Sequence, residues 1–208
     1  MMPVAAGIVL SAARVGTTRV RSLCSTKLFL GIDPSITNTG VVLLDAEGKL
    51  LGCADGSEYT KGIKGFDRYI AQAEGVARFV RNNTKPGCSI VCGYEGYSYN
   101  SPHRAFDLAE YGGILKQVLR KHLGIDTIYL IPPTLNKNFA TGHGTASKEL
   151  MQQAAADECA DLLNTSNDIC DAYFLAMFAA FVNGVRNSAN RKLMRKRISL
   201  TLRYKETV

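Results

Sequence analysis

Two short apolar segments that each end at a carboxylate constrain the fold of this chain more than any other feature. Residues 28–33 read LFLGID, and residues 88–94 form an apolar run followed directly by Glu95. Apolar runs of this length, bounded by turn residues, are typical of strands buried inside a sheet. An acid at the end of a strand is commonly a turn residue, so its meaning depends on the residues around it.

The segments around these two strands predict an α/β fold. Residues 41–45 and 49–53 are two more strands after tight turns, so the chain begins as a three-strand meander. Later segments alternate between helical periodicity and short apolar runs. They predict helices at about 66–80, 104–122, 148–163 and 168–185, a strand at 125–131 and a polar, glycine-containing loop at 136–147. This order predicts one domain with a mixed central sheet of about five strands flanked by helices.

Charge is distributed unevenly along the 208 residues, whose formal net charge is +7. Residues 1–27 hold four basic residues and no acid, and residues 186–208 hold eight basic residues and one acid. The body between them, residues 28–185, has thirteen basic and seventeen acidic residues. We therefore expect an N-terminal extension, a mildly acidic globular domain and a basic C-terminal tail.

The N-terminal extension has the composition of a transit peptide, because it is rich in Ala, Val, Ser, Thr and Arg and lacks acids. It predicts import into the mitochondrion; the alternative is a disordered extension on a protein of the cytoplasm or nucleoid. The six cysteines form no C-x-x-C pair, which favours a reduced, intracellular protein. No apolar run reaches the roughly 18 residues of a spanning helix, so no membrane partner is expected.

A second pair of acids lies near the C-terminal end of the body. Asp168 and Asp171 are three residues apart at the start of a predicted helix, which places them on one helical face. Asp171 precedes a long apolar run, where an unpaired charge is costly. Crowded carboxylates repel unless cations lie between them, and oxygen-only ligands favour Mg²⁺, with Mn²⁺ as a substitute. Two such ions would stabilise the attacking and leaving oxygens of a phosphodiester displacement.

These motifs together resemble the RuvC family of Holliday-junction resolvases, within the ribonuclease H-like superfamily. Residues 30–40, LGIDPSITNTG, resemble the family's first-strand motif; Glu95 matches its second acid, and D-x-x-D-A at 168–172 its C-terminal motif. The segment from Lys137 to Lys148 resembles its basic loop, and FATGHG at 139–144 is most similar to the phage-type branch. The resemblance extends in order over roughly residues 28–184.

The resemblance implies a ribonuclease H-like fold, a homodimer, and paired nicks in a four-way DNA junction made with two metal ions per active site. Four residues then become metal ligands and catalytic residues: Asp33, Glu95, Asp168 and Asp171. A structure-selective, metal-dependent endonuclease acting in DNA recombination and repair is therefore the function that the sequence favours.

Residues outside the acidic set would contact DNA. The resemblance makes Lys137 and Lys148 phosphate contacts, with Lys148 also assisting catalysis. Tyr97 and Tyr99 lie on either side of the position where the family places its branch-point aromatic, so either could stack on a base. The tail residues expected to add DNA contacts are Arg191, Lys192, Arg195, Lys196 and Arg197.

Three other functions remain alternatives at the level of sequence. The segment 31–40 also resembles the first phosphate loop of the actin–sugar kinase superfamily, but 208 residues without an internal repeat cannot supply that superfamily's second lobe. A non-catalytic junction-binding protein is disfavoured because all four acids are present. A related nuclease acting on RNA or another branched nucleic acid is poorly separated from a DNA enzyme, because phosphates dominate affinity for both polymers.

Overall fold

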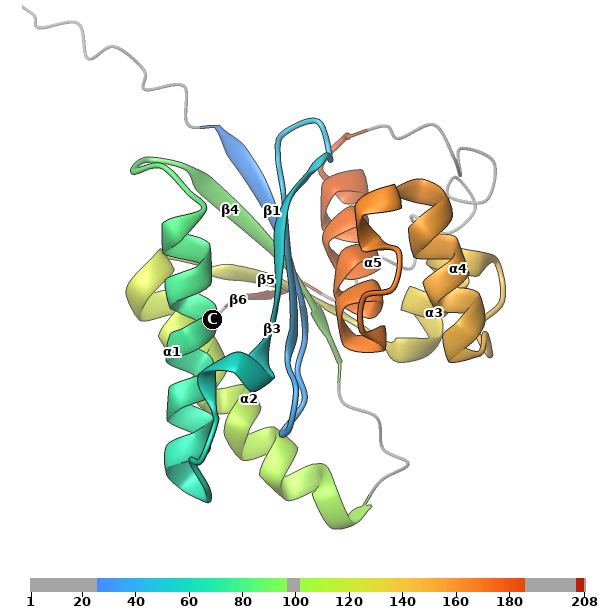
Figure 1. The fold of residues 1–208 in the computed structure, drawn as a ribbon. Helices are drawn as coiled ribbons and strands as arrows, with labels where there is room; N and C mark the ends of the chain where they lie inside the picture. Colours follow the sequence, from blue (N-terminus) through green and yellow to red (C-terminus); the bar gives the residue numbers. More distant parts are fainter. Residues whose placement is uncertain (1–25, 97–101, 186–204, 208) are drawn as a thin grey trace, which may run out of the picture.

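A mixed sheet of six strands, in the order β3-β2-β1-β4-β5-β6, forms the centre of the fold (Figure 1). The computed structural model describes residues 26–96, 102–185 and 205–207. Strands β1, β4 and β5 are parallel to one another, and β2 and β6 run antiparallel to their neighbours. The strands are β1 Lys27–Asp33, β2 Gly40–Leu44, β3 Leu50–Asp55, β4 Ser89–Glu95, β5 Thr127–Ile131 and β6 Lys205–Thr207.

Helices cover both faces of this sheet. Figure 1 shows α1 and α2 packed side by side on one face and α3, α4 and α5 on the other. The helices are α1 Phe66–Asn82, α2 Pro102–Leu123, α3 Pro133–Thr141, α4 Lys148–Glu158 and α5 Asn167–Val182, with 3₁₀ turns at Gly56–Tyr59 (η1) and Ala160–Leu162 (η2). In the part of the chain that the structure describes, no helix is both long enough and apolar enough to cross a membrane.

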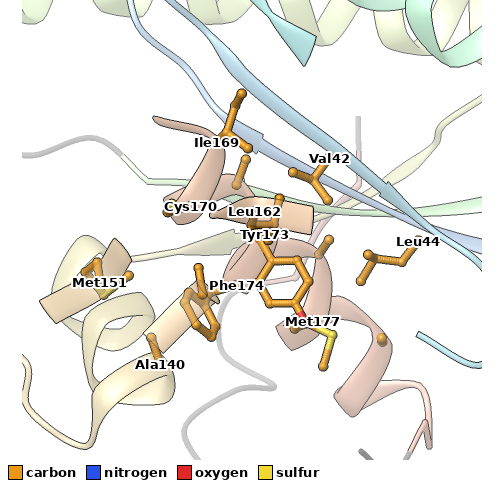
Figure 2. Packing of buried hydrophobic residues seen from close by; sticks show 14 of the residues in the cluster. Val42, Leu44, Ala140, Met151, Leu162, Ile169, Cys170, Tyr173, Phe174 and Met177 are labelled. Atoms are coloured by element: carbon orange, nitrogen blue, oxygen red, sulfur yellow. The ribbon is translucent and has the colours of Figure 1, made fainter. Parts of the chain in front are cut away.

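Because successive side chains of a strand point to opposite faces, the sheet divides the core in two. Leu30 and Ile32 of β1 face α1 and α2, whereas Phe29 of the same strand faces α5. Figure 2 shows the second half, in which Tyr173 and Phe174 of α5 pack against residues of β2 and α4. Nearly every residue of α5 after its first turn is buried, so this helix is fixed across the middle of the sheet.

The structure confirms the predicted α/β fold, with a mixed sheet flanked by helices. The predicted loop at 136–147 was wrong over its first half, because α3 occupies Pro133–Thr141. Proline lacks a backbone N–H and therefore fits the first turn of a helix, so Pro133 begins α3 and does not exclude it. Gly142 ends the helix in a left-handed conformation, with φ of 85°.

Two further differences concern the C-terminal half. The helix predicted over 148–163 ends at Glu158. Cys159 is extended, and the 3₁₀ turn η2 follows it. The short strand β6, inside the segment predicted as a basic tail, pairs antiparallel with β5 and adds a sixth strand to the sheet. Its three residues show no apolar alternation, so the sequence pattern does not indicate a strand there.

Candidate active site

Two of the predicted acids meet because their strands are parallel neighbours. Strands β1 and β4 pair with Ile32 opposite Tyr94, so the next residues, Asp33 and Glu95, leave the sheet side by side at the carboxyl edge. Asp33 is almost completely buried, with 7% of its surface exposed. A hydrogen bond links the carboxyl groups of Asp33 and Glu95, which raises the pKa of Asp33 and lowers that of Glu95. The register of the sheet therefore brings the side chains of Asp33 and Glu95 together.

Glycines at three positions of the sheet let α5 approach closely enough to complete the site. A methyl group on Gly31 would lie 1.9 Å from the backbone oxygen of Ala172, and one on Gly93 would lie 2.2 Å from that of Leu175. A methyl group on Gly40, opposite Asp33 in the β1–β2 ladder, would lie 2.0 Å from the backbone oxygen of Asp168. Any larger residue at these positions would push the start of α5 away from Asp33.

The first turn of α5 carries the other two acids. The side chain of Ser166 caps the helix by accepting a hydrogen bond from the backbone N–H of Ile169. Asp168 accepts a hydrogen bond from the side chain of Asn38, which lies in the turn after β1. Asp171 points inward, and within residues 26–96 and 102–185 its Oδ1 atom is buried without a hydrogen-bond partner. A buried carboxylate oxygen without a donor is costly unless a cation or proton binds it.

Burial and mutual repulsion raise the pKa values of all four acids. Burial, followed by the charges of Glu95, Asp171 and Asp168, holds the pKa of Asp33 well above its usual range. Burial and the Glu95 charge raise the pKa of Asp171 to about 7. Burial also raises the pKa values of Glu95 and Asp168, against the opposing effects of their hydrogen bonds. The acids therefore form one electrostatic cluster in which each ionisation disfavours the others.

Both predicted lysines lie near this cluster. Lys137 lies on α3, and its charge lowers the pKa values of Glu95 and Asp171 against the larger effect of burial. Lys148 is the first residue of α4, and its charge acts in the same direction on Asp168 and Asp171. The structure thus places both lysines near the acidic cluster, Lys137 close to Glu95 and Lys148 close to Asp168.

The donor set fits hard divalent cations. As the side chains are placed, no three His, Cys, Asp or Glu residues of the described ranges stand close enough together to enclose an ion. The set nevertheless provides carboxylate oxygens from two strand ends and one helix, including Oδ1 of Asp171, which has no hydrogen-bond partner in the part of the chain that the structure describes. Oxygen ligands of this kind suit Mg²⁺ and Mn²⁺, and positive charge would relieve the repulsion that raises the pKa values.

Three residues of the site do not belong to the predicted set. Asn38 supports Asp168, and the side chain of Asn136, which is fully buried, donates a hydrogen bond of 3.1 Å to the backbone oxygen of Asp171. Asp55, at the end of β3, adds negative charge near Asp168. Asn38 lies in the turn after β1, and Asp55 is the last residue of β3. A polar residue at or just after a strand end is the sequence signal that could have indicated both.

The remaining predicted DNA contacts lie outside the described residues. They are the loop tyrosines, Tyr97 and Tyr99, and the tail residues Arg191, Lys192, Arg195, Lys196 and Arg197. The structure therefore brings together six of the predicted site residues: Asp33, Glu95, Asp168, Asp171, Lys137 and Lys148.

Comparison with known proteins identifies the fold. The sequence matches no protein-family model and no curated protein sequence. By structure, the chain is similar to RuvC of Thermus thermophilus, with a TM-score of 0.56 and 20% sequence identity over 75% of this chain and 94% of that one. The same protein solved in complex with a Holliday junction substrate matches with a TM-score of 0.55, again at 20% identity. The chain therefore has the ribonuclease H-like fold of RuvC.

Proposed function

We propose that this protein is a metal-dependent endonuclease that resolves four-way DNA junctions. The observation that carries the proposal is the convergence of Asp33, Glu95, Asp168 and Asp171 at one edge of a RuvC-like sheet, with two lysines nearby. The similar Thermus thermophilus RuvC has been solved with a Holliday junction substrate, which supports branched DNA as the substrate here. The likeness of segment 139–144 to the phage-type branch belongs to this proposal.

In this mechanism the four acids would hold two divalent ions, Mg²⁺ or Mn²⁺. Such ions lower the pKa of bound water and stabilise charge on the scissile phosphate. Lys137 and Lys148 contact the phosphates on either side of the acids, which places the DNA backbone over the cluster. Asn38 orients the Asp168 carboxylate through its hydrogen bond, and the buried Oδ1 of Asp171, which has no hydrogen-bond partner among the described residues, would bind an ion.

A junction-cleavage assay tests the proposal. Purified protein should nick a synthetic four-way junction in Mg²⁺ at symmetrical positions, and Asp33→Asn should abolish nicking while leaving junction binding intact. Asp161→Asn, which changes an exposed acid on η2, is the matched control and should cleave normally. Cleavage by Asp33→Asn would refute the assignment. Competition with linear duplex and structured RNA at fixed salt distinguishes a junction enzyme from a nuclease acting on RNA.

We further propose that the enzyme acts as a homodimer. One chain carries one acidic cluster, whereas paired nicks need two. The groove between α1 and α2, about 370 Å³ in volume, offers a second copy four apolar residues beside four polar ones. The apolar residues are Phe66, Ile70, Ile114 and Val118, and the polar residues are Glu74, Gln117, Lys121 and His122. Phe66 and Ile70 are 53% and 41% exposed. Ile70→Glu should shift the protein to monomer in sedimentation, whereas Leu163→Glu, at an exposed position on another surface, should not.

The regions outside the described residues complete the proposal. We propose that Tyr97 or Tyr99 stacks on a base at the branch point and that the basic residues of 191–197 bind phosphates. The proposed parts are a transit peptide at 1–27, the nuclease domain at 28–185 and the basic tail at 186–208, with the mature protein in the mitochondrion. Mass spectrometry of the N-terminus of the native protein tests the processing.

A further inference from the structure

A buried polar network connects the turn after β1 to the helices on the opposite face of the sheet. The side chains of Thr39, Gln72 and Tyr111 meet there, and each is at most 1% exposed. Nε2 of Gln72, on α1, lies within hydrogen-bonding distance of the Thr39 hydroxyl, of the Tyr111 hydroxyl at 3.0 Å and of the backbone oxygen of Ser35 at 2.6 Å. Its two hydrogens are shared among these three acceptors. The hydroxyls of Thr39 and Tyr111 are 2.7 Å apart. Three separate elements are thus joined through one amide group.

This network lies directly behind the acidic cluster. Thr39 precedes Gly40, which pairs with Asp33 across the β1–β2 ladder. Asn38, the residue before Thr39, holds the carboxylate of Asp168 and also accepts a hydrogen bond of 3.2 Å from the backbone N–H of Ser57. A displacement of the turn would therefore move the end of β1 and the partner of Asp168 together.

Packing alone does not explain the amide of Gln72. In the part of the chain that the structure describes, its Oε1 atom is buried without a hydrogen-bond partner, which destabilises the fold. A methionine of similar volume would fill the space without burying an unpartnered oxygen. The neighbouring Gly56 leaves room for this arrangement, because a methyl group there would lie 2.8 Å from the backbone nitrogen of Thr39 and 3.1 Å from the Gln72 side chain.

The backbone of the turn depends on the same side chains. The Thr39 hydroxyl donates to the backbone oxygen of Ser35 at 3.0 Å and accepts from the Ser35 N–H at 3.3 Å, so it closes the turn on itself. The hydrogen bond from Gln72 to the same Ser35 oxygen then fixes the closed turn to α1. Buried hydrogen bonds of this kind reinforce one another and restrict the backbone they hold.

We propose that Gln72 and Tyr111 are positioning residues for the metal-binding acids. They act through Thr39 to hold the turn at 34–39. The position of this turn then fixes Asp33 and Asn38 relative to Asp168. The inference rests on the proposed function in that the acids are taken as ligands of divalent ions. It adds that the helix layer remote from α5 sets the affinity of the site for those ions, without touching the ions or DNA.

Direct Mn²⁺ binding to the full-length protein, measured by calorimetry, tests this role. Gln72→Met and Tyr111→Phe should each weaken Mn²⁺ binding about fivefold, which corresponds to the loss of roughly one net hydrogen bond. Junction binding without metal should change less than about twofold, because neither residue lies at the proposed DNA surface. Gln153→Met and Tyr69→Phe are the matched controls: Gln153 is exposed on α4, and the Tyr69 ring packs 5.8 Å from that of Tyr111 without a hydrogen bond to the network among the described residues.

The alternative is a purely structural role, which would lower the melting temperature of both variants and leave the Mn²⁺ affinity of the folded protein unchanged. That result would overturn the proposal. If Gln72→Met does not fold, Thr39→Val and Thr39→Ser provide the same test, since only the serine keeps the hydroxyl and should retain Mn²⁺ affinity. Wild-type protein that binds Mn²⁺ but cuts no junction would refute the nuclease assignment alone. Wild-type cleavage with unchanged Mn²⁺ binding in the variants would refute the positioning role alone.

Discussion

Asp171→Asn should stabilise the metal-free protein at neutral and alkaline pH. Asp171 is buried beside Glu95 and Asp168, and its Oδ1 atom has no hydrogen-bond partner among residues 26–96 and 102–185. Ionising this carboxyl therefore destabilises the folded protein but not the unfolded chain, in which water solvates the charge. Asparagine has nearly the same shape and carries no charge, so the substitution removes that cost and keeps the packing of α5.

The magnitude follows from the pKa of Asp171. Burial and the Glu95 charge raise it from 3.8 to about 7, and each unit of pKa corresponds to about 1.4 kcal/mol. The cost at pH 8 is therefore at most about 4 kcal/mol. Relaxation of the site and partial hydration of the carboxylate relieve part of this cost, so we expect a measured gain of about 1–3 kcal/mol, or roughly 3–10 °C in melting temperature for a chain of this size.

The gain should depend on pH with a definite sign. Between pH 4 and pH 7 the folded protein binds a proton at Asp171 that the unfolded chain releases, so the stability of the wild type falls as pH rises through this window. Above pH 7 the carboxyl is ionised in both states and the loss is complete. Below pH 4 it is protonated in both states, and the advantage of asparagine vanishes.

Urea unfolding in EDTA at pH 5 and pH 8 measures the gain in free energy of unfolding and its dependence on pH. Asp161→Asn, in which an exposed acid of η2 is changed, serves as the control and should leave stability nearly unchanged at either pH. The reasoning is refuted if Asp171→Asn is no more stable than wild type at pH 8, or if it is equally stabilised at pH 5 and pH 8.

Other predictions follow from contacts around the site. Gly93→Ala should lower the free energy of unfolding by about 3 kcal/mol, because its methyl group would lie 2.2 Å from the backbone oxygen of Leu175. Gly113→Ala should raise it by about 0.5–1 kcal/mol in the same urea titration, because a methyl group there would meet no other described part of the protein within 4 Å outside its own helix. Mg²⁺ at about 100 times its dissociation constant should stabilise the wild type by about 2.7 kcal/mol in thermal melts, and Asp33→Asn should lose this effect. Asn136→Ala should cost about 1–3 kcal/mol and slow junction cleavage, because the hydrogen bond to the start of α5 is lost.

The strands and the acids could be predicted because both are local signals. An apolar run that ends at Asp33 or Glu95 marks a strand and its carboxyl end without knowledge of the rest of the fold. The proximity of Asp33 and Glu95 is not local, since it requires β1 and β4 to be parallel neighbours with Ile32 opposite Tyr94. The resemblance to RuvC supplied that arrangement at the level of sequence, and the structure shows the register that produces it.

The helix α3 was missed because local rules gave conflicting signals. Pro132 and Pro133 disfavour a helix interior, and Gly142 is typical of a loop, so the segment between them read as irregular. The same residues are favourable at helix ends, where Pro133 begins α3 and Gly142 ends it. The consequence for the site is that Lys137 is held on a helix, which is further fixed by the buried side chain of Asn136.

Gln72 and the close-packed glycines could not be recognised without tertiary structure. A glutamine between apolar positions of an amphipathic helix is ordinarily a solvent-exposed residue, yet Gln72 is 1% exposed. In the sequence, Gly31 and Gly93 look like strand positions that would accept a larger residue. The tertiary structure shows that α5 crosses there and that any side chain would collide with the backbone of α5. These positions carry little chemistry of their own, but they determine where Asp168 and Asp171 lie.

The charge distribution of the chain and the chemistry of the site have a common origin. The body carries four more acidic than basic residues, which matches the number of acids in the cluster. Without cations, that cluster repels a phosphate backbone at the point where the backbone would have to be cut. Two bound divalent ions would cancel this excess, and the neighbouring Lys137 and Lys148 would then make the local charge positive. Binding of ions and of DNA should therefore strengthen each other reciprocally, because each reduces the electrostatic cost of the other. We therefore expect the basic residues of 186–208 to bind DNA before the site holds its ions, and cleavage to follow only after the ions have bound.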